Sequence, residues 1–322
     1  MSRANSSNTR FPTPAPVRSD GAWLPAGQLA LFAEAGTNCH RIYSSGEGWI
    51  ERLGEDALIS YKHAEAEARL REGLAAWATE TGCAIRRIFG KFIPRQNEER
   101  VAPTLLAGEA GLPMCTVVQE NGVRYGLDFE AGYSAGLFLD QRANRAYVRG
   151  LGAKRLLNTF AYTCSFSVVA ALSGAQTVSI DLSKKSLDRG KENFTLNGLA
   201  AEGHQFFADD VMETLPRLAR RGERFDVIIL DPPTFSRGHK GRRFQVEQSF
   251  EELLSAALEV AGPDARVLLS TNCARLDRGE LERTARHCLK LCRRAATFHR
   301  EQALVDIPGE LGAQTLWAAL KG

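Results

Sequence analysis

The chain has 322 residues, of which 44% are hydrophobic, and its formal net charge is +3 because 41 basic residues nearly balance 38 acidic ones. A chain of this length and composition can bury a full hydrophobic core, and two folded units are expected. So small a net charge gives, by itself, no argument for nucleic-acid binding.

The seven cysteines are scattered and none lies in a Cys-x-x-Cys pair. This pattern excludes a disulfide framework, disfavours a zinc site and suits a reducing cytoplasm. Residues 1–20 lack the apolar centre of a signal peptide. Residues 156–180 carry no formal charge, but their polar side chains and two breaks indicate strand, turn, helix and strand rather than a membrane span.

In chain order, residues 1–38 are predicted to be a disordered tail and a short helix over 26–35. Residues 39–132 are predicted to form a small α+β domain. Its expected elements are strands around 41–43 and 49–53, a helix over 62–81, a strand over 86–92, and a hairpin over 114–129 that turns at Asn121-Gly122.

From residue 133 to 322, strands and helices alternate, which predicts a parallel, doubly wound α/β sheet of the Rossmann-like kind. Its strands are expected at 155–158, 177–181, 204–208, 225–230, 266–271 and 315–320, with a helix over 281–293.

The turn at 158–163 joins the first of these strands to a small-residue helix, and Asp181 ends the second strand. Such a turn aims helix-terminal N–H groups at a ligand, and a carboxylate at the second strand suits ribose hydroxyls, so a nucleoside cofactor is expected. A dinucleotide oxidoreductase is the rival, but no GxGxxG is present. An ordinary turn, with Asp181 or Ser183 capping the next helix, is the alternative without a ligand.

The apolar strand at 225–230 delivers Asp231-Pro232-Pro233 at its carboxyl end, where ligands and chemistry lie in open α/β sheets. The two prolines fix φ and remove two N–H donors, which leaves the carboxylate directed into the cleft. Phe235 could stack on a base, or it could be a core residue after a rigid turn. Asp-Pro-Pro in this place is typical of methyl transfer to planar bases.

Five segments in the same order, 136–145, 157–163, 181–183, 192–198 and 231–236, resemble the bacterial class I S-adenosylmethionine-dependent methyltransferases of 23S ribosomal RNA. That family includes a cytosine-C5 enzyme and the guanine-N7 half of a dual methyltransferase. The resemblance covers about residues 39–322 and implies S-adenosylmethionine as cofactor and RNA as partner. Cys164 departs from the glycine usual in the family, and no PUA or THUMP segment is visible.

The cofactor contacts expected from this resemblance and from the motifs are Asp140, Arg142, Asn158, Phe160, Tyr162, Thr163, Asp181, Ser183, Asp209 and Asp231. Asp209 would meet the adenine amino group, although Asp209 and Asp210 could equally cap the following helix. Asp140 and Arg142 would close over the carboxylate end of the cofactor, or be a solvated helix start. Asn193 and Asn197 are expected to tie their helix to neighbouring loops.

Cys273 follows the strand at 266–271, where the cytosine-C5 relative has a cysteine. Its thiolate would add to C6 of the pyrimidine and raise the electron density at C5, provided that a neighbour lowers its pKa. The alternative is a small core residue. Asp-Pro-Pro-Thr-Phe-Ser is closer to the guanine-N7 relative, where no covalent step is needed. The catalytic candidates are therefore Asp231, Cys273 and Phe235, and the choice between the two bases stays open.

The basic loop after Asp-Pro-Pro is expected to contact RNA phosphates through Arg237, Lys240, Arg242 and Arg243. A second basic group around Arg286 and Lys290 is expected to be a solvated helix face. A protein or small-molecule methyltransferase and a catalytically inactive RNA-binding assembly factor are the competing functions, since a fold does not fix a substrate.

Overall fold

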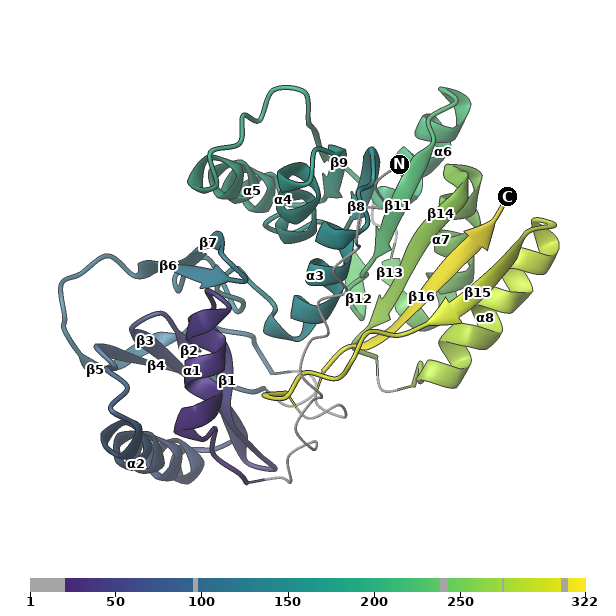
Figure 1. The fold of residues 1–322 in the computed structure, drawn as a ribbon. Helices are drawn as coiled ribbons and strands as arrows, with labels where there is room; N and C mark the ends of the chain where they lie inside the picture. Colours follow the sequence, from purple (N-terminus) through teal and green to yellow (C-terminus); the bar gives the residue numbers. More distant parts are fainter. Residues whose placement is uncertain (1–20, 95–97, 238–242, 274, 308–311) are drawn as a thin grey trace, which may run out of the picture.

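The computed structural model describes residues 21–94, 98–237, 243–273, 275–307 and 312–322. In this part of the chain the larger sheet has seven strands in the order β10-β9-β8-β11-β14-β16-β15 (Figure 1). They are β8 (Arg155–Thr159), β9 (Gln176–Asp181), β10 (Gln205–Ala208), β11 (Phe225–Leu230), β14 (Ala261–Thr271), β15 (Ala295–His299) and β16 (Gln314–Lys321). The first five in this order are parallel, and β16 is antiparallel to both of its neighbours.

Helices cover both faces of this sheet (Figure 1). On one face, α3 (Arg142–Gly150) packs on α4 (Ser165–Leu172), and α4 packs on α5 (Lys184–Leu196). On the other, α6 (Val211–Arg220), α7 (Val246–Glu259) and α8 (Arg278–Leu291) lie side by side. Strand β11 is buried on both faces, since Ile228 and Leu230 enter one core cluster and Val227 and Ile229 the other. The uninterrupted apolar run of a parallel strand follows from this double burial.

The N-terminal unit has its own five-stranded sheet, in the order β1-β2-β3-β4-β5, within the described residues. Its elements are α1 (Ala26–Glu34), β1 (Cys39–Ser45), β2 (Gly48–Leu53), β3 (Asp56–Tyr61), α2 (Ala64–Thr81), β4 (Arg87–Phe92) and β5 (Thr104–Gly108). Its core includes Ile42, Ile59, Leu74 and Trp77. Helix α2 ends at Gly82, whose left-handed φ of 67° favours glycine.

A separate hairpin, β6 (Cys115–Glu120) with β7 (Val123–Asp128), connects the two units. It turns at Asn121-Gly122, where both residues have positive φ, as a two-residue hairpin turn of this sequence requires. Asn193 of α5 and Asn197, which follows its last residue, hydrogen-bond the backbone of β7, so the expected tethering role of these two asparagines agrees with their contacts.

The predicted fold class is confirmed, and the predicted hairpin and final strand are present. The sheet is mixed rather than wholly parallel, because the final strand is antiparallel to its neighbours, and β3, β5 and β15 were not predicted. Two short strands, β12 (Phe235–Arg237) and β13 (Arg243–Gln245), pair after Asp-Pro-Pro, and a 3₁₀ turn, η1 (Leu139–Gln141), precedes α3. Residues 1–20 of the predicted tail lie outside the described residues, and the short helix is present as α1. The boundary near residue 132 stays a prediction, because the hairpin contacts both units. Among the described helices, none has the length and apolar character needed to cross a bilayer.

Candidate active site

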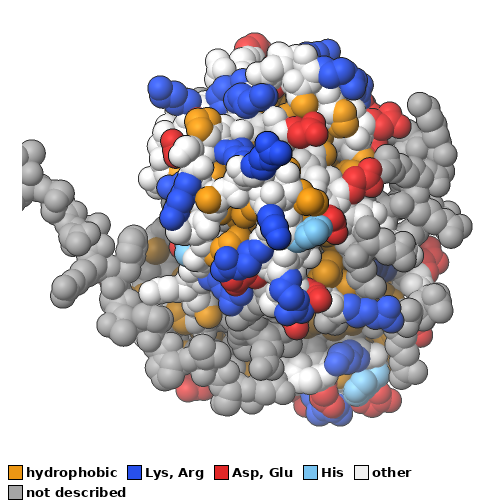
Figure 2. All heavy atoms as spheres, turned by 90° about the vertical axis from the view of Figure 1, so that its right-hand side faces the viewer, with side chains coloured by type: hydrophobic (Ala, Val, Ile, Leu, Met, Phe, Trp, Pro, Cys, Tyr) orange, Lys and Arg blue, Asp and Glu red, His pale blue; other side chains and the backbone are white. Residues whose placement is uncertain are grey.

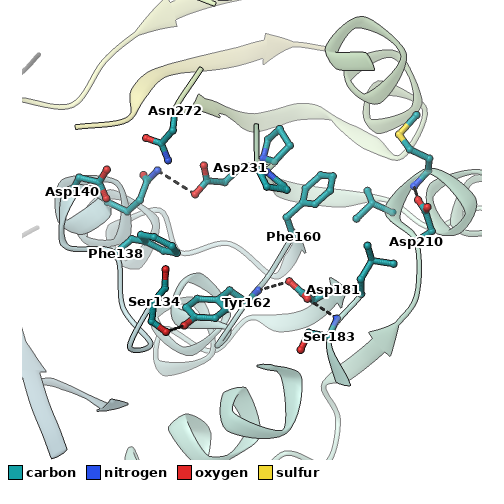
Figure 3. A pocket seen from close by; sticks show the side chains of 16 residues that line it. Ser134, Phe138, Asp140, Phe160, Tyr162, Asp181, Ser183, Asp210, Asp231 and Asn272 are labelled. Atoms are coloured by element: carbon teal, nitrogen blue, oxygen red, sulfur yellow. Dashed lines mark hydrogen bonds between the residues drawn. The ribbon is translucent and has the colours of Figure 1, made fainter. Parts of the chain in front are cut away.

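A pocket of about 390 Å³ lies where β8, β9 and β11 end (Figure 3). The chain leaves β8 toward β9 on one side of the sheet, while β11 and β14 lie on the other, so this is the switch point at which open α/β sheets bind ligands. It is lined by Ser134, Phe138, Asp140, Gln141, Phe160, Tyr162, Asp181, Leu182, Ser183, Asp210, Val211, Met212, Asp231, Pro232, Pro233 and Asn272.

The turn after β8 is held in an unusual backbone conformation. Phe160, Tyr162 and Cys164 have φ values of 53°, 47° and 59°, in the left-handed region that side chains other than glycine rarely adopt. The N–H of Tyr162 donates to Oδ2 of Asp181 at 2.8 Å, and the Tyr162 hydroxyl donates to the carbonyl of Ser134 at 2.6 Å (Figure 3). Strain of this kind concentrates at functional sites.

Asp181 is fixed at the end of β9 by two backbone donors. Besides Tyr162, the N–H of Ser183 donates to Oδ1 at 2.8 Å. Burial raises the pKa of Asp181 above the usual carboxyl value, and the two N–H groups partly offset that rise. Ser183, not Asp181, caps α5, because its Oγ accepts from the N–H of Ser186. The alternative in which Asp181 caps a helix is therefore wrong.

Asp209 and Asp210, which follow β10, were both candidates for capping α6, and Asp209 was also expected to contact adenine. Asp210 lines the pocket and caps α6 by accepting from the N–H of Met212 at 2.8 Å. Asp209 does not line the pocket, and its carboxylate pairs with Arg217 of α6. This geometry argues against the adenine contact expected of Asp209, whereas Asp210 and Met212 do line the pocket.

Asp231 is half-buried at the opposite end of the pocket from Asp181 and Asp210 (Figure 3). Its Oδ2 accepts a hydrogen bond of 3.2 Å from Nε2 of Gln141. The pKa of Asp231 is raised to about 6. Burial is the main cause, the hydrogen bond from Ser270 opposes it, the charge of Asp140 adds to the rise, and the hydrogen bond from Gln141 lowers the pKa slightly.

Besides Asp209, three predicted cofactor residues lie outside the pocket lining, and their side chains have other partners. Arg142 pairs through both terminal nitrogens with buried Asp306, at 3.1 and 2.6 Å. The side chain of Asn158 donates to Ser167, and that of Thr163 donates to the carbonyl of Gly136. These contacts argue against the closure by Arg142 and leave Asn158 and Thr163 as residues that shape the turn. Asp140 does line the pocket, and it accepts from the N–H of Ala313.

Cys273 is packed in the hydrophobic core, with 5% of its surface exposed, and does not line the pocket. The residue before it, Asn272, does. Of the remaining candidates, the side chains of Phe235, Arg237 and Arg243 lie outside what the structure describes, as do Lys240 and Arg242 altogether. Their roles stay predictions.

Helix α8, which carries Arg286 and Lys290, lies on the side of the molecule shown in Figure 2, where Lys and Arg side chains are interleaved with Asp and Glu. Arg286 pairs with Glu282, and Arg294 donates to carbonyls at 261–263. The Arg286 pair agrees with the solvated helix face expected there, whereas Arg294 follows the end of α8 and is held by backbone carbonyls. In the described residues no group of three or more His, Cys, Asp or Glu is placed to hold a metal ion.

Sequence reasoning assigned no role to Phe138, Gln141 or Asn272, although all three line the pocket. Phe138 and Gln141 stand inside the segment 136–145 that carried the family resemblance, and Asn272 follows the carboxyl end of β14. The position of Asn272 after a strand end could have indicated a site residue, but the catalytic role was predicted for the adjacent Cys273.

Comparison with known proteins identifies the family. Residues 57–305 match the model of S-adenosylmethionine-dependent methyltransferases, and the chain belongs to that family. It is 38% identical over 162 residues to ribosomal RNA large subunit methyltransferase I of Aeromonas salmonicida, which covers 50% of the chain and 40% of the relative. It is 36% identical over 211 residues to ribosomal RNA large subunit methyltransferase K of Neisseria meningitidis, covering 65% and 58%. The chain thus spans about two-fifths to three-fifths of these relatives' length.

Among solved structures, the methyltransferase SMU.776, in complex with SAH, is 26% identical and superposes with a TM-score of 0.78 over 91% of this chain and 78% of that one. S-adenosylmethionine is the cofactor of the family, and the pocket here fits it. The cavity volume lies in the range of small-molecule sites, and half-buried Asp181 lines it with a carboxylate, an acceptor that suits ribose hydroxyls. The apolar walls from Phe160, Val211 and Met212 suit a flat adenine ring.

Proposed function

We propose that this chain transfers a methyl group from S-adenosylmethionine to a base of 23S ribosomal RNA, and so acts in the cytoplasm. The observation that carries the proposal is that one pocket is lined at one end by Asp181, a carboxylate at a strand end that suits ribose hydroxyls, and at the other by the Asp231-Pro-Pro segment. The names of the relatives support the RNA substrate.

S-adenosylmethionine, when bound, supplies a methyl group activated by a sulfonium. Asp181 would accept hydrogen bonds from the ribose hydroxyls, and the backbone around Tyr162 would surround the methionine part. The acceptor base would lie beside Asp231, Pro232 and Asn272, where the prolines leave the strand end without N–H donors. Holding the acceptor and the methyl donor in one pocket supplies most of the catalysis by orientation.

The buried position of Cys273 supports an acceptor that needs no covalent attachment, and we favour guanine N7 over cytosine C5. N7 already has a lone pair and carries no proton, so no base is required. The methylated purine is positively charged, and the Asp231 carboxylate is the group in the pocket lining placed to stabilise it.

The test is methyl transfer from labelled S-adenosylmethionine to unmodified 23S RNA, followed by nucleoside mass spectrometry, with wild type and Cys273→Ala. We expect 7-methylguanosine from both. If 5-methylcytidine forms and Cys273→Ala abolishes it, the covalent pyrimidine mechanism replaces this one. If RNA stays unlabelled although SAH binds, the acceptor is a protein or a small molecule, or the chain is an RNA-binding factor without activity.

The cofactor end is tested separately by calorimetric binding of SAH to Asp181→Asn. Loss of a charged acceptor for two hydroxyls should weaken binding at least about tenfold. The matched control is Asp188→Asn on α5, an exposed aspartate paired with Lys184 and Lys191, which should bind SAH like wild type. Equal affinities for both variants would remove Asp181 from the cofactor site.

A further inference from the structure

A chain of buried amide side chains lies behind Asp231. Gln141, at the end of η1, is 2% exposed, and its Nε2 donates both to Oδ2 of Asp231 at 3.2 Å and to Oγ of Ser270 at 2.9 Å (dashed line to Asp231 in Figure 3). Its Oε1 accepts from Nδ2 of Asn144, one turn further on, at 2.8 Å. Oδ1 of Asn144 in turn accepts from the indole Nε1 of Trp317 at 2.8 Å. All these residues except Asp231 are fully or almost fully buried.

The direction of this chain is fixed at its far end. An indole N–H can only donate, so the atom of Asn144 that faces Trp317 must be its carbonyl oxygen. The NH₂ group of Asn144 therefore faces Gln141, which must present its own oxygen to it. As a result, the NH₂ group of Gln141 faces the pocket, with one N–H for Asp231 and one for Ser270. The orientation of both amides follows from donor chemistry and needs no assumption about which atom is nitrogen.

An amide without such an anchor can turn over, and a reversed Gln141 would place a carbonyl oxygen against the Asp231 carboxylate. Trp317 prevents this reversal of the amide. It lies on β16, which pairs with β14, and β14 carries Ser270. The anchor is thus part of the sheet itself, since Trp317 is completely buried in the core. A group held in this way keeps its geometry without support from a ligand.

We propose that Gln141 is a positioning residue for Asp231: oriented by Trp317 through Asn144, it holds the carboxylate in the direction in which it meets the acceptor base. The inference rests on the proposed function for the identity of the acceptor, while the hydrogen-bonded relay and its effect on Asp231 stand without it. Donation from Gln141 favours the charged carboxylate, which burial disfavours.

The experiment titrates Asp231 directly, by the ¹³Cγ chemical shift of labelled aspartate, with the signal assigned through Asp231→Asn. Three variants are compared with wild type: Gln141→Met, which keeps the length and removes the donor; Gln141→Glu, whose protonated form keeps both shape and donor; and Asn38→Leu. Asn38→Leu is the matched control, because it also removes one side-chain amide hydrogen bond. Oδ1 of Asn38 accepts from the N–H of Gln119, and Asn38 is far along the chain from the segments that line the pocket.

In Gln141→Met the titration of Asp231 should move up by about one pH unit, the size expected for losing a hydrogen bond to a charged group. In Gln141→Glu two carboxyl groups share one proton, so the pair should lose it at a pH well above that of wild type. Asn38→Leu should titrate like wild type. An unchanged Asp231 titration in both Gln141 variants, with SAH still bound, would overturn the inference.

Trp317→Phe supplies a second test that leaves Gln141 in place. Removing the indole donor should move the Asp231 titration in the same direction as Gln141→Met, and an unchanged titration or a shift in the opposite direction contradicts the relay. Neither titration requires a known acceptor, so a chain that methylates no RNA but shows these shifts would disprove the proposed function and keep the inference. If 23S RNA is methylated, the acid limb of the pH–rate profile should follow the same shifts.

Discussion

Cys164 stands at a left-handed position, φ 59°, a backbone conformation that favours glycine. The side chain of Cys164 fits because the residue of α5 that faces it is Gly190, which has no side chain. A Cβ placed on Gly190 would come within 2.5 Å of Sγ of Cys164 and 2.9 Å of its Cβ. The two residues are therefore adapted to each other: the larger residue in the turn requires the smaller one on the helix.

Gly190→Ala is expected to destabilise the protein by about 1–3 kcal/mol through overpacking, although alanine is the better helix former. In a Cys164→Gly background the obstruction is absent, so the same change should be neutral or stabilising. Urea unfolding of the four proteins measures the coupling. Equal effects of Gly190→Ala in both backgrounds would show that the turn moves freely.

The raised pKa of Asp231 predicts a specific pH dependence of stability. In the folded protein this pKa is about 6, above the ordinary 3.8. Below pH 3.8 the carboxyl is neutral in both states, so burial costs nothing; the cost grows between pH 3.8 and 6 and is constant above. Asp231→Asn removes this cost of burying a charged carboxylate.

The stabilisation of Asp231→Asn over wild type should therefore be larger at pH 8 than at pH 4, by about 1–3 kcal/mol for a shift of this size. Unfolding in urea across this pH range measures it. Asp188→Asn should have an almost constant effect between pH 4 and 8, because hydrogen bonds from Lys184 and Lys191 lower the pKa of that carboxyl and its contribution is lost only below about pH 3.8. A pH-independent effect of Asp231→Asn would mean that the carboxylate is better solvated than its position indicates.

At the scale of elements, the hairpin β6–β7 is attached to α3 by a buried ion pair. Arg145 donates to both carboxylate oxygens of Glu120, at 2.7 and 2.6 Å, and also to the carbonyl of Phe138 at 2.9 Å. Both side chains of the pair are 2% exposed. The guanidinium thus links the hairpin to the segment that carries Phe138 and Gln141 into the pocket.

Glu120→Ala leaves a buried guanidinium without its main partner, which should cost about 3–5 kcal/mol. Replacing the exposed partner of a surface pair, as in Glu282→Ala beside Arg286, should cost less than about 1 kcal/mol. Chemical denaturation of both variants checks the contrast. A Glu120→Ala protein as stable as the Glu282→Ala control would indicate that solvent reaches Arg145.

Sequence patterns predicted the elements whose burial is regular. The continuous apolar run of β11 and the Asn121-Gly122 turn are examples, and both were found. Strand β15 was not predicted because Ala295–His299 is short and only partly buried, and it exists through its pairing with β16. In the site, strand ends located Asp181 and Asp231, whereas the partners of Arg142 and Asp209 depend on tertiary contacts, to Asp306 and Arg217, that no local pattern contains.

For the whole molecule, one buried carboxylate joins three parts of the chain. Asp306 accepts from both terminal nitrogens of Arg142 in α3 and from the backbone N–H of Arg41 in β1, at 2.9 Å. Burial would raise the pKa of Asp306, but the charge and hydrogen bonds of Arg142 outweigh it and hold that pKa below its usual value. One core cluster also includes residues of both units, such as Cys39 and Leu156. The N-terminal unit and the catalytic sheet should therefore unfold together.

This cooperativity can be measured because three of the four tryptophans, Trp23, Trp49 and Trp77, report on the N-terminal unit, while far-UV circular dichroism reports on the whole chain. At neutral pH the two signals should change at the same urea concentration. Since the folded pKa of Asp306 is depressed, its contribution is complete above about pH 3.8 and is lost as the pH falls through the lower folded value. Asp306→Ala removes it at every pH and leaves Arg142 buried, so fluorescence should then change at lower urea than circular dichroism. Coincident curves in Asp306→Ala would show that the shared apolar core alone couples the two units.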